Sequence, residues 1–171
     1  MKKKVIFLDI DGVLNSRKYD QQRKTIKDGN IDETRLVLLS QLVKDTGAVI
    51  VLSSTWRKGW DKQSSLCSPS ALYINETLAK YGIGVYDKTP VISATNRDVE
   101  IKAWLEAHKD EVGEFVILDD ILFGWGDLSP HLVRTDYYVG YGLEESHVEK
   151  AEKILSGVLD DEDEENEDAV Y

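Results

Sequence analysis

The sequence predicts an α/β fold built on a doubly wound, mainly parallel sheet with helices on both faces, and three observations support this prediction. Short, continuous apolar runs occupy residues 5–8, 48–52 and 115–118, as in strands that are buried on both faces. Segments with helical spacing of apolar residues alternate with these runs. Each run ends in polar residues, and such sheets bind ligands beyond the carboxyl ends of their strands.

The expected helices follow from capping residues and apolar spacing. Asp32 can cap a helix that runs to about Lys44, because Leu36, Leu39 and Leu42 share one face and Gly47 follows the end. Further helices are expected to start at Ser70, with Gly82 as the stop, at Asn96 and at Leu143, the last of these running to Leu155. Weaker strand candidates lie at residues 83–86 and 132–139.

The length and charge of the chain indicate one domain followed by an acidic tail. The chain has 171 residues, within the usual range of about 100–200 for a single domain. Residues 160–168 hold eight acids and no base, and without them 24 acids stand against 21 bases. We therefore expect a core over residues 1–157 and a disordered tail over residues 158–171. A body so near neutrality does not favour non-specific binding of nucleic acid, which needs a basic face.

The sequence also limits the compartment and the redox chemistry. Cys67 is the only cysteine, which excludes an internal disulfide framework and a multi-cysteine metal site. Lysines and an apolar run open the chain, but Asp9 and Asp11 interrupt that run too early for a signal peptide. Because no apolar run approaches the roughly 18 residues of a membrane span, we expect a cytoplasmic protein with no membrane partner.

The first strand candidate ends in two carboxylates and a glycine. Asp9 and Asp11 lie two residues apart, and Gly12 permits a tight turn directly after them. Two acids this close repel each other unless a cation or a shared proton intervenes. A hard divalent cation with oxygen ligands is one solution, and an Asx-rich turn without any ligand is the alternative.

Later segments add to this pair at other strand ends. Asp119 and Asp120 follow the run at residues 115–118, and Ser53 follows the run at residues 48–52. Two bases, Arg97 and Lys102, lie in or near the helix that precedes Asp119. Acids for a cation, hydroxyl and amide donors for an anion, and a base to neutralise that anion together match the needs of phosphoryl transfer.

These motifs resemble those of the haloacid dehalogenase (HAD) superfamily over residues 3–155. The sequence Asp-Ile-Asp-Gly at 9–12 is similar to its first motif, Ser53 to its second, and the acidic pair at 119–120 to its fourth. The third motif is a lone base, for which Arg97 is the first choice and Lys102 the alternative. The sequence Leu-Ser-Ser-Thr-Trp-Arg at 52–57 and the sequence Gly-Leu-Glu-Glu at 142–145 more narrowly resemble small bacterial and phage members, some allied to RNA-repair phosphatases.

The resemblance implies a magnesium-dependent phosphatase with defined residue roles. Asp9 would be the nucleophile that forms an aspartyl-phosphate, and Asp11 would be the general acid and base. The resemblance further implies that Mg²⁺ is held by Asp9, the backbone carbonyl of Asp11, Asp119, and Asp120 as a ligand or as the neighbour of one. It also implies that the phosphate oxygens are bound by Ser53, Ser54 and Arg97.

Substrate choice in this superfamily depends on cap insertions, and here both intervals that could hold one are short. An open crevice would admit a bulky phosphorylated substrate, such as a nucleic-acid end or a protein, as well as a small molecule or nucleotide. Bases that could recognise it are Arg17, Lys18, Arg23, Lys24, Lys27, Arg57, Lys58 and Lys62. Aromatic residues that could stack on bases are Tyr19, Trp56 and Trp60, with Trp125 either at the mouth or in the core. The alternative is that these loops are solvated and their aromatic residues pack on the body.

Two other functions stay open. A receiver-type phospho-acceptor domain uses similar residues, but it needs adjacent acids after the first strand and a lone aspartate on a middle strand. A non-catalytic binding or regulatory module of HAD fold would keep the architecture without turnover. The intact Asp9 and Asp11 favour the phosphatase over this third interpretation.

Overall fold

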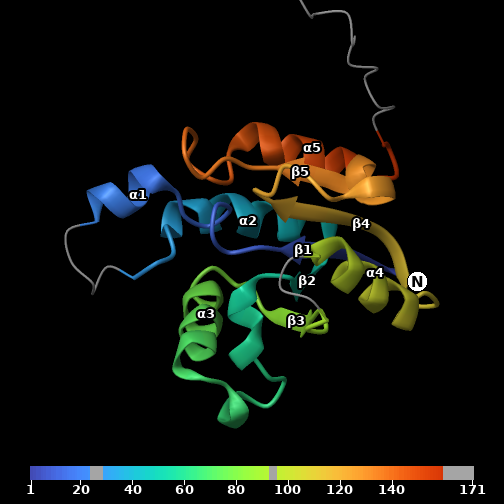
Figure 1. The fold of residues 1–171 in the computed structure, drawn as a ribbon, viewed down its shortest axis with the longest axis horizontal. Helices are drawn as coiled ribbons and strands as arrows, with labels where there is room; N and C mark the ends of the chain where they lie inside the picture. The colour runs from blue at the N-terminus through green and yellow to red at the C-terminus, as the bar shows by residue number, and fades with distance from the viewer. Residues whose placement is uncertain (24–28, 93–95, 160–171) are drawn as a thin grey trace, which may run out of the picture.

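The computed structural model describes residues 1–23, 29–92 and 96–159 (Figure 1). Almost all of the expected acidic tail, from residue 160 onwards, lies outside the described residues. Among the helices of the described ranges, none is both long and apolar enough to cross a membrane.

Five strands form one sheet within the described ranges, and every neighbouring pair is parallel. They are β1 (Lys3–Leu8), β2 (Val49–Leu52), β3 (Val85–Lys88), β4 (Val112–Asp119) and β5 (Leu132–Arg134), in the spatial order β3-β2-β1-β4-β5. The predicted α/β class with a parallel sheet is therefore confirmed. Receiver-type domains have the order 2-1-3-4-5, so the observed order argues against that alternative.

The helices are α1 (Arg17–Gln22), α2 (Glu33–Thr46), α3 (Pro69–Ala79), α4 (Arg97–Ala107) and α5 (Glu145–Leu155). Asp32 caps α2 by accepting a hydrogen bond from the Thr34 amide, and Gly47 ends it at a φ of 69°, as the sequence indicates. Helix α3 begins before Ser70, because Ser68 is the residue that caps it and Pro69 occupies its first turn. Helix α5 begins two residues later than expected, with Glu144 as its N-cap.

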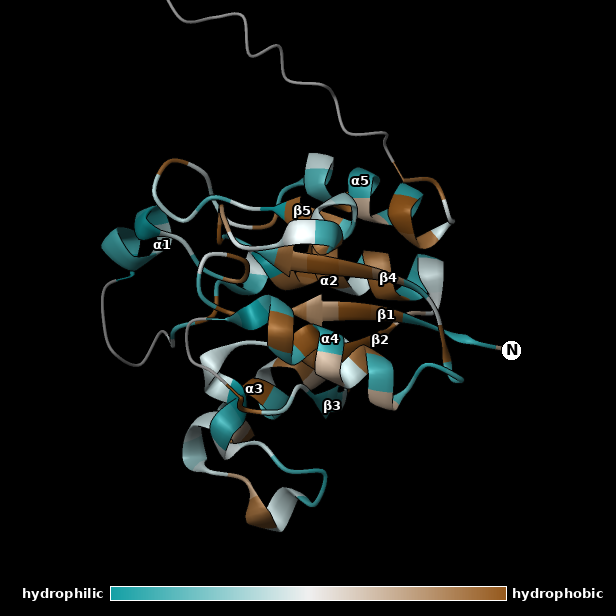
Figure 2. Ribbon diagram, turned by 45° about the vertical axis from the view of Figure 1, so that its right-hand side comes forward, coloured by the Kyte–Doolittle hydropathy of each residue, from teal (hydrophilic) through white to brown (hydrophobic). Residues whose placement is uncertain are grey.

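Both faces of the sheet are covered by helices. Alternate residues of β1 point to opposite faces, so that Ile6 and Leu8 join one core cluster while Val5 and Phe7 join the other. Helices α2, α3 and α5 contribute to the first cluster, and α4 contributes Ile101 and Trp104 to the second. The strands accordingly form a hydrophobic layer between helices whose outer faces are polar (Figure 2).

The two weaker strand predictions are only partly right. The strand expected over residues 132–139 stops at Arg134, because the Asp136 carboxylate accepts hydrogen bonds from the amides of Tyr138 and Val139 in a local turn. The strand expected over residues 83–86 lies at Val85–Lys88. Its first expected residue, Ile83, instead donates its amide to Leu78 at the end of α3.

The two intervals that could hold a cap contain only short elements. Residues 15–48 contain α1 and α2 in their described part, and residues 56–96 contain 3₁₀ turns, α3 and β3 in theirs. In the described residues neither interval forms a folded domain of its own, as their lengths predict.

Candidate active site

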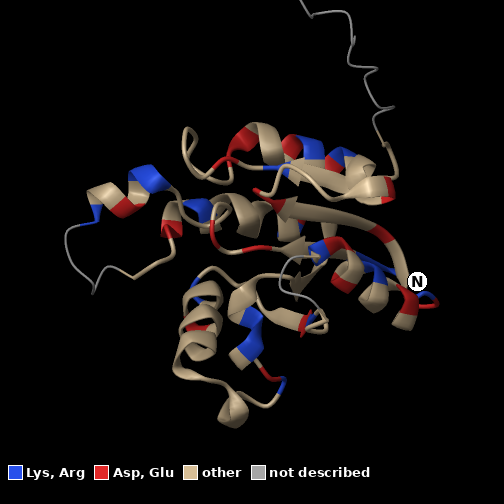
Figure 3. Cartoon of the chain, viewed as in Figure 1, with Lys and Arg blue, Asp and Glu red and all other residues tan. Residues whose placement is uncertain are grey.

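The candidate site lies where the direction of the strand order changes. The chain moves from β1 outward to β2 and β3, and then returns to place β4 on the other side of β1. Ligands in doubly wound sheets bind at this switch point, beyond the carboxyl ends of the strands. Asp9 directly follows β1 and Asp119 is the last residue of β4, so the topology brings both acids to this point. Figure 3 shows acidic residues, drawn in red, near the ends of the central strands.

Three of the predicted acids form one cluster there. Asp9, Asp119 and Asp120 each offer a carboxylate oxygen, and these oxygens lie within 4.8 Å of one another. Asp9 and Asp119 are buried and Asp120 is partly buried. The structure thus unites residues that are about 110 positions apart in the chain, but it leaves Asp11 outside this group, on the exposed side of the turn.

Arg97 joins the cluster, whereas Lys102 does not. The Arg97 Nη1 atom is 2.9 Å from Asp9 Oδ2 and 2.7 Å from Asp119 Oδ2. The Lys102 ammonium pairs instead with Asp127 at 2.5 Å on the outer surface. Arg97 is the first residue of α4, so its position at the helix start aims it at the strand ends, and Lys102 lies too far along the helix.

Burial and crowding shift the pKa values of the clustered groups. Burial, together with the charges of Asp119 and Asp120, raises the pKa of Asp9 to about 7, although Arg97 opposes the shift. Burial and the charge of Asp119 raise the pKa of Asp120 to about 6. Burial lowers the pKa of Arg97, but its two carboxylate partners outweigh this and raise it overall. The cluster therefore carries more negative charge than one guanidinium can neutralise.

The turn after Asp9 is built around Gly12. This glycine has a φ of 85°, and a Cβ atom added to it would collide with the Asp120 carboxylate. The Asn15 side chain organises the turn, since its Oδ1 accepts from the Gly12 amide at 2.8 Å and its Nδ2 donates to Asp11 Oδ1 at 2.9 Å. The Thr135 hydroxyl donates to the Gly12 carbonyl at 2.6 Å and ties the turn to the segment after β5.

Trp56 holds the other oxygen of Asp11. Its indole Nε1 donates to Asp11 Oδ2 at 2.9 Å, although the two residues are 45 positions apart. Neither Trp56 nor Asn15 was expected to contact this carboxylate. Asn15 belongs to the same turn as Asp11, so its position in the motif was an available signal, whereas no local signal indicates the Trp56 contact. Together they fix the orientation of an exposed carboxylate.

Ser53 and Ser54 occupy the strand end next to the cluster. The Ser53 amide donates to the Leu8 carbonyl at 3.0 Å, which continues the register of β2 beside β1. The Ser53 Oγ atom is buried and has no hydrogen-bond partner among the described residues. Such an atom is costly to bury without a partner, so Ser53 Oγ is available to bind a polar ligand or a water. Ser54 differs, because its hydroxyl accepts from the Trp56 amide at 3.3 Å and caps the following turn.

The donor set of this site fits a hard divalent cation. All side-chain ligands it offers are carboxylate oxygens, the type that Mg²⁺ prefers. Burial is the first cause of the raised pKa values of Asp9 and Asp120, the neighbouring carboxylates add to it, and a cation between them would favour the charged forms. The unpartnered Ser53 hydroxyl beside them fits an anionic group that would accompany the cation.

The basic and aromatic loop residues do not form the expected recognition surface as a whole. Arg57 was expected at the mouth, but it is buried and paired with Glu100 at 2.6 Å. Trp60 is also buried, with its indole donating to Asn75. Trp125 packs in the core cluster that contains Phe7, and it also lines a small hollow together with Arg97. Each is a long or bulky side chain whose burial depends on distant partners. Two of the expected bases, Lys24 and Lys27, lie outside the described residues.

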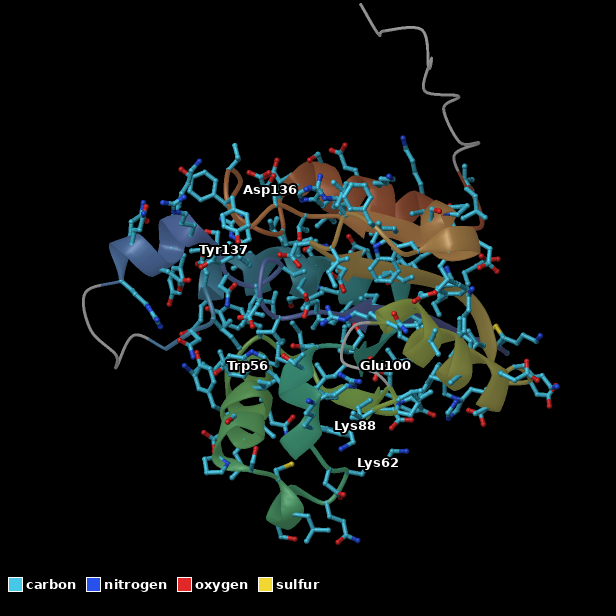
Figure 4. All side chains as sticks on the ribbon, viewed as in Figure 1. Trp56, Lys62, Lys88, Glu100, Asp136 and Tyr137 are labelled. Carbon is cyan, nitrogen blue, oxygen red and sulfur yellow. The ribbon has the colours of Figure 1, made fainter. Side chains whose placement is uncertain are left out.

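Other members of that set remain at the surface. Arg17, Lys58 and Lys62 are exposed, while Lys18 stands 4.2 Å from the centre of the Tyr141 ring. Tyr19 and Arg23 are partly buried, and both donate to the Gly29 carbonyl. Trp56 and Tyr137 lie on the side of the molecule where the strands end (Figure 4). Trp56 is therefore the member of the predicted aromatic set that adjoins the acids.

The hollows of the surface differ in size and position. One of about 610 Å³ lies between α2 and the start of α5, away from the acids, and includes Arg35 and Tyr141 in its wall. A much smaller one, of about 50 Å³, is lined by Arg97, Ile121 and Phe123 among others, and none of Asp9, Asp119 and Asp120 lines it.

Comparison with protein families identifies one that matches most of the chain. A family model described as "HAD domain in Swiss Army Knife RNA repair proteins" matches residues 5–148. This range includes the acids, Ser53 and Arg97, and it extends to the first turn of α5. Comparisons with curated proteins and with solved structures give no significant match.

Proposed function

The chain belongs to the family of HAD domains found in Swiss Army Knife RNA repair proteins, and from this we propose that it is a phosphatase-like hydrolase that removes a terminal phosphate with the help of Mg²⁺. One observation carries the proposal above all others. Three carboxylates and Arg97 converge at the ends of β1 and β4, and the adjacent end of β2 carries Ser53, whose buried hydroxyl has no hydrogen-bond partner among the described residues. The carboxylates suit a cation, and the Ser53 hydroxyl suits an anion. A phosphate monoester that binds together with Mg²⁺ requires both.

The reaction proceeds in two displacements. The Asp9 carboxylate attacks phosphorus while the bond to the leaving oxygen breaks, and Asp11 gives its proton to that oxygen. The product is an aspartyl-phosphate on Asp9 and a free alcohol. Asp11 then takes a proton from water, the resulting hydroxide attacks phosphorus, and the Asp9–phosphorus bond breaks to release inorganic phosphate. Its exposed position lets Asp11 meet both the leaving group and water.

Other groups bind and neutralise the phosphate. Arg97, fixed between Asp9 and Asp119, supplies a donor for the non-reacting oxygens, and the Ser53 hydroxyl supplies another. Ser54 shapes this loop by capping the turn that carries Trp56. Asp9, Asp119 and Asp120, with the Asp11 backbone carbonyl, would hold the magnesium ion, which when bound stabilises negative charge on the phosphoryl group.

The substrate that we propose is a phosphorylated nucleic-acid end. The name of the family refers to RNA repair, and the described residues leave the strand ends without a folded cap. The terminal phosphate would lie between Arg97 and Ser53 while the polymer extends over the surface above the strand ends. Trp56 lies next to Asp11, where its ring can stack on the terminal base.

A substrate screen tests this function. Purified protein is incubated with p-nitrophenyl phosphate, nucleotides, sugar phosphates, and oligonucleotides that carry a 3′- or 5′-phosphate, each with and without Mg²⁺. We expect Mg²⁺-dependent release of phosphate, fastest from an oligonucleotide end. No Mg²⁺-dependent release from any compound would refute the proposal and favour a non-catalytic binding module.

Replacing Trp56 by Phe tests how Asp11 is oriented. The Phe variant keeps an aromatic ring for stacking but loses the indole N–H that donates to Asp11. Because a hydrogen bond to a charged group contributes about 1.5–3 kcal/mol, we expect kcat to fall roughly tenfold or more with KM little changed. Steady-state kinetics measures both values. A fall in substrate affinity alone would show instead that Trp56 acts only on binding.

The pKa of Asp9 makes stability and metal binding depend on pH in opposite ways. The pKa is about 7 in the folded protein and near 3.8 when unfolded, so the folded state holds the extra proton between these values. Protonation of Asp9 therefore contributes to the stability of the metal-free protein. The contribution is complete below the unfolded pKa of 3.8 and is lost as pH rises through the folded pKa of about 7. The metal requires the deprotonated carboxylate, so added Mg²⁺ should raise the melting temperature more at about pH 8 than at about pH 5. In Asp9→Asn, the stability of the metal-free protein and its stabilisation by Mg²⁺ should both depend less on pH. Equal stabilisation of the parent by Mg²⁺ at the two pH values would contradict this account.

A further inference from the structure

Behind the phosphate-binding serine lies a buried ion pair that the proposed chemistry does not use. Arg57 Nη2 and Glu100 Oε2 are 2.6 Å apart, and the two side chains are 2% and 3% exposed. Arg57 follows β2 in the Thr55–Gly59 turn, and Glu100 lies in the first turn of α4 (Figure 4 labels Glu100). The pair therefore joins two elements that approach the site from different parts of the sheet.

The Arg57 guanidinium holds three segments of the chain together. Its Nη1 donates to the Ser54 carbonyl at 2.9 Å and, at the longer distance of 3.5 Å, to the Ser53 carbonyl. Its Nε donates to the Thr89 carbonyl at 3.0 Å, and its Nη2 donates to the Pro90 carbonyl at 3.1 Å as well as to Glu100. These bonds connect the serine loop, the segment after β3 and helix α4.

Glu100 completes this connection from the helix. Its Oε2 accepts from Arg57 and also from the Ile92 amide at 2.9 Å. Arg97 lies three residues earlier on the same helix, almost one turn away, and pairs with Asp9 and Asp119. A shift of α4 would therefore move Arg97 and Glu100 together relative to Ser53. The ion pair spans the two elements that supply the proposed phosphate donors.

Stability alone does not explain a buried ion pair. Removing two charges from water costs free energy that their mutual attraction repays only in part, and an apolar pair of similar volume is often at least as stable. What an arginine adds is geometry, because its rigid planar fork fixes several acceptors in defined directions. Here those acceptors are the backbone of the serine loop and the carboxylate of α4.

We propose that Arg57 and Glu100 are positioning residues that set the serine loop against the start of α4, and thereby the spacing between Ser53 and Arg97. This inference rests on the proposed function, since it assigns these two residues to the affinity of that site for a phosphate group. Neither residue touches the substrate. Small errors in spacing matter, because a misplacement of about 1 Å can cost roughly 100-fold in rate.

The decisive variant replaces both charges by apolar side chains of similar volume, Arg57→Met with Glu100→Leu. No unpaired charge is left, but the carbonyls of Ser54, Thr89 and Pro90 and the Ile92 amide lose their partner. Its melting temperature should therefore fall below that of the parent, but less than that of Arg57→Met alone. The dissociation constant of inorganic phosphate, measured by calorimetry in the presence of Mg²⁺, should rise roughly tenfold. Glu100→Gln, which keeps the shape and an acceptor oxygen, is the second variant and should weaken phosphate binding less.

Ile101→Val is the matched control, because Ile101 is buried on the same helix but packs in the core cluster with Phe7 and Trp104. It should lower the melting temperature without changing phosphate affinity. Unchanged phosphate affinity in both charge-removing variants would overturn the proposal and leave the pair a purely structural one. Because binding is measured directly, this result is distinct from a failure of the parent protein to hydrolyse any phosphomonoester, which would refute the proposed function instead.

Discussion

We expect that Asp9→Asn abolishes turnover while the protein stays folded. The amide cannot attack phosphorus, and loss of a catalytic nucleophile lowers kcat by up to roughly 10⁶-fold in a well-studied hydrolase. We expect a fall of at least about 1,000-fold, measured as Mg²⁺-dependent release of p-nitrophenol or of phosphate from an oligonucleotide end. The metal-free variant should be no less stable than the parent at neutral pH, because Asn removes a buried charge that faces Asp119 and Asp120.

Asp127→Asn is the matched control for this change. Asp127 is an exposed aspartate that pairs with Lys102 outside the site, so its replacement should leave turnover unchanged. Substantial activity in Asp9→Asn would show that another group is the nucleophile. Loss of folding in the same variant would contradict the expectation that Asp9→Asn is no less stable than the parent, and would show that the ion pair with Arg97 contributes more to stability than the buried charge costs.

Arg57→Met alone should destabilise the protein by about 3–5 kcal/mol, because it leaves Glu100 buried without its charged partner. Five hydrogen bonds to the guanidinium are lost at the same time, including those to the carbonyls of Ser54 and Thr89. Urea unfolding followed by tryptophan fluorescence measures the change in the free energy of unfolding. Adding Glu100→Leu should recover part of this free energy, because it removes the unpaired charge, but the backbone carbonyls that Arg57 bound stay without a partner.

Lys80→Met provides the comparison at the surface. Lys80 and Glu33 form an exposed ion pair at 3.4 Å, and such pairs contribute at most about 1 kcal/mol. If Arg57→Met destabilises no more than Lys80→Met, then Glu100 is not left as an unpaired buried charge. In that event water or a rearranged loop must replace the guanidinium. The proposal that the ion pair sets the spacing between Ser53 and Arg97 would then be wrong.

The sequence contains enough local information to predict the sheet and the acids at its edge. Apolar runs at residues 5–8, 48–52 and 115–118 became β1, β2 and β4, because strands buried on both faces leave a continuous apolar signal. Asp9, Ser53 and Asp119 come directly after or at the ends of these strands. Parallel pairing alone therefore brings them to one edge, and little further information is needed.

The remaining parts of the site depend on contacts that no local pattern encodes. The burial of Arg57 requires Glu100, 43 positions away, and the orientation of Asp11 requires Trp56, 45 positions away. The choice between Arg97 and Lys102 depends on where α4 begins relative to the sheet, and an error of a few residues in a helix boundary would reverse it. A charged residue in a loop is usually solvated, so composition predicts exposure for Arg57, and the tertiary pairing overrides it.

The covalent intermediate offers the sharpest test of this mechanism. The parent protein is mixed with a phosphorylated oligonucleotide and Mg²⁺, quenched with acid during turnover, digested and analysed by mass spectrometry. We expect one phosphoryl group on the peptide that contains Asp9, which is absent in Asp9→Asn and when Mg²⁺ is chelated. A phosphoryl group on any other residue, or turnover with no phosphorylated peptide, would contradict the assignment of Asp9 as the nucleophile.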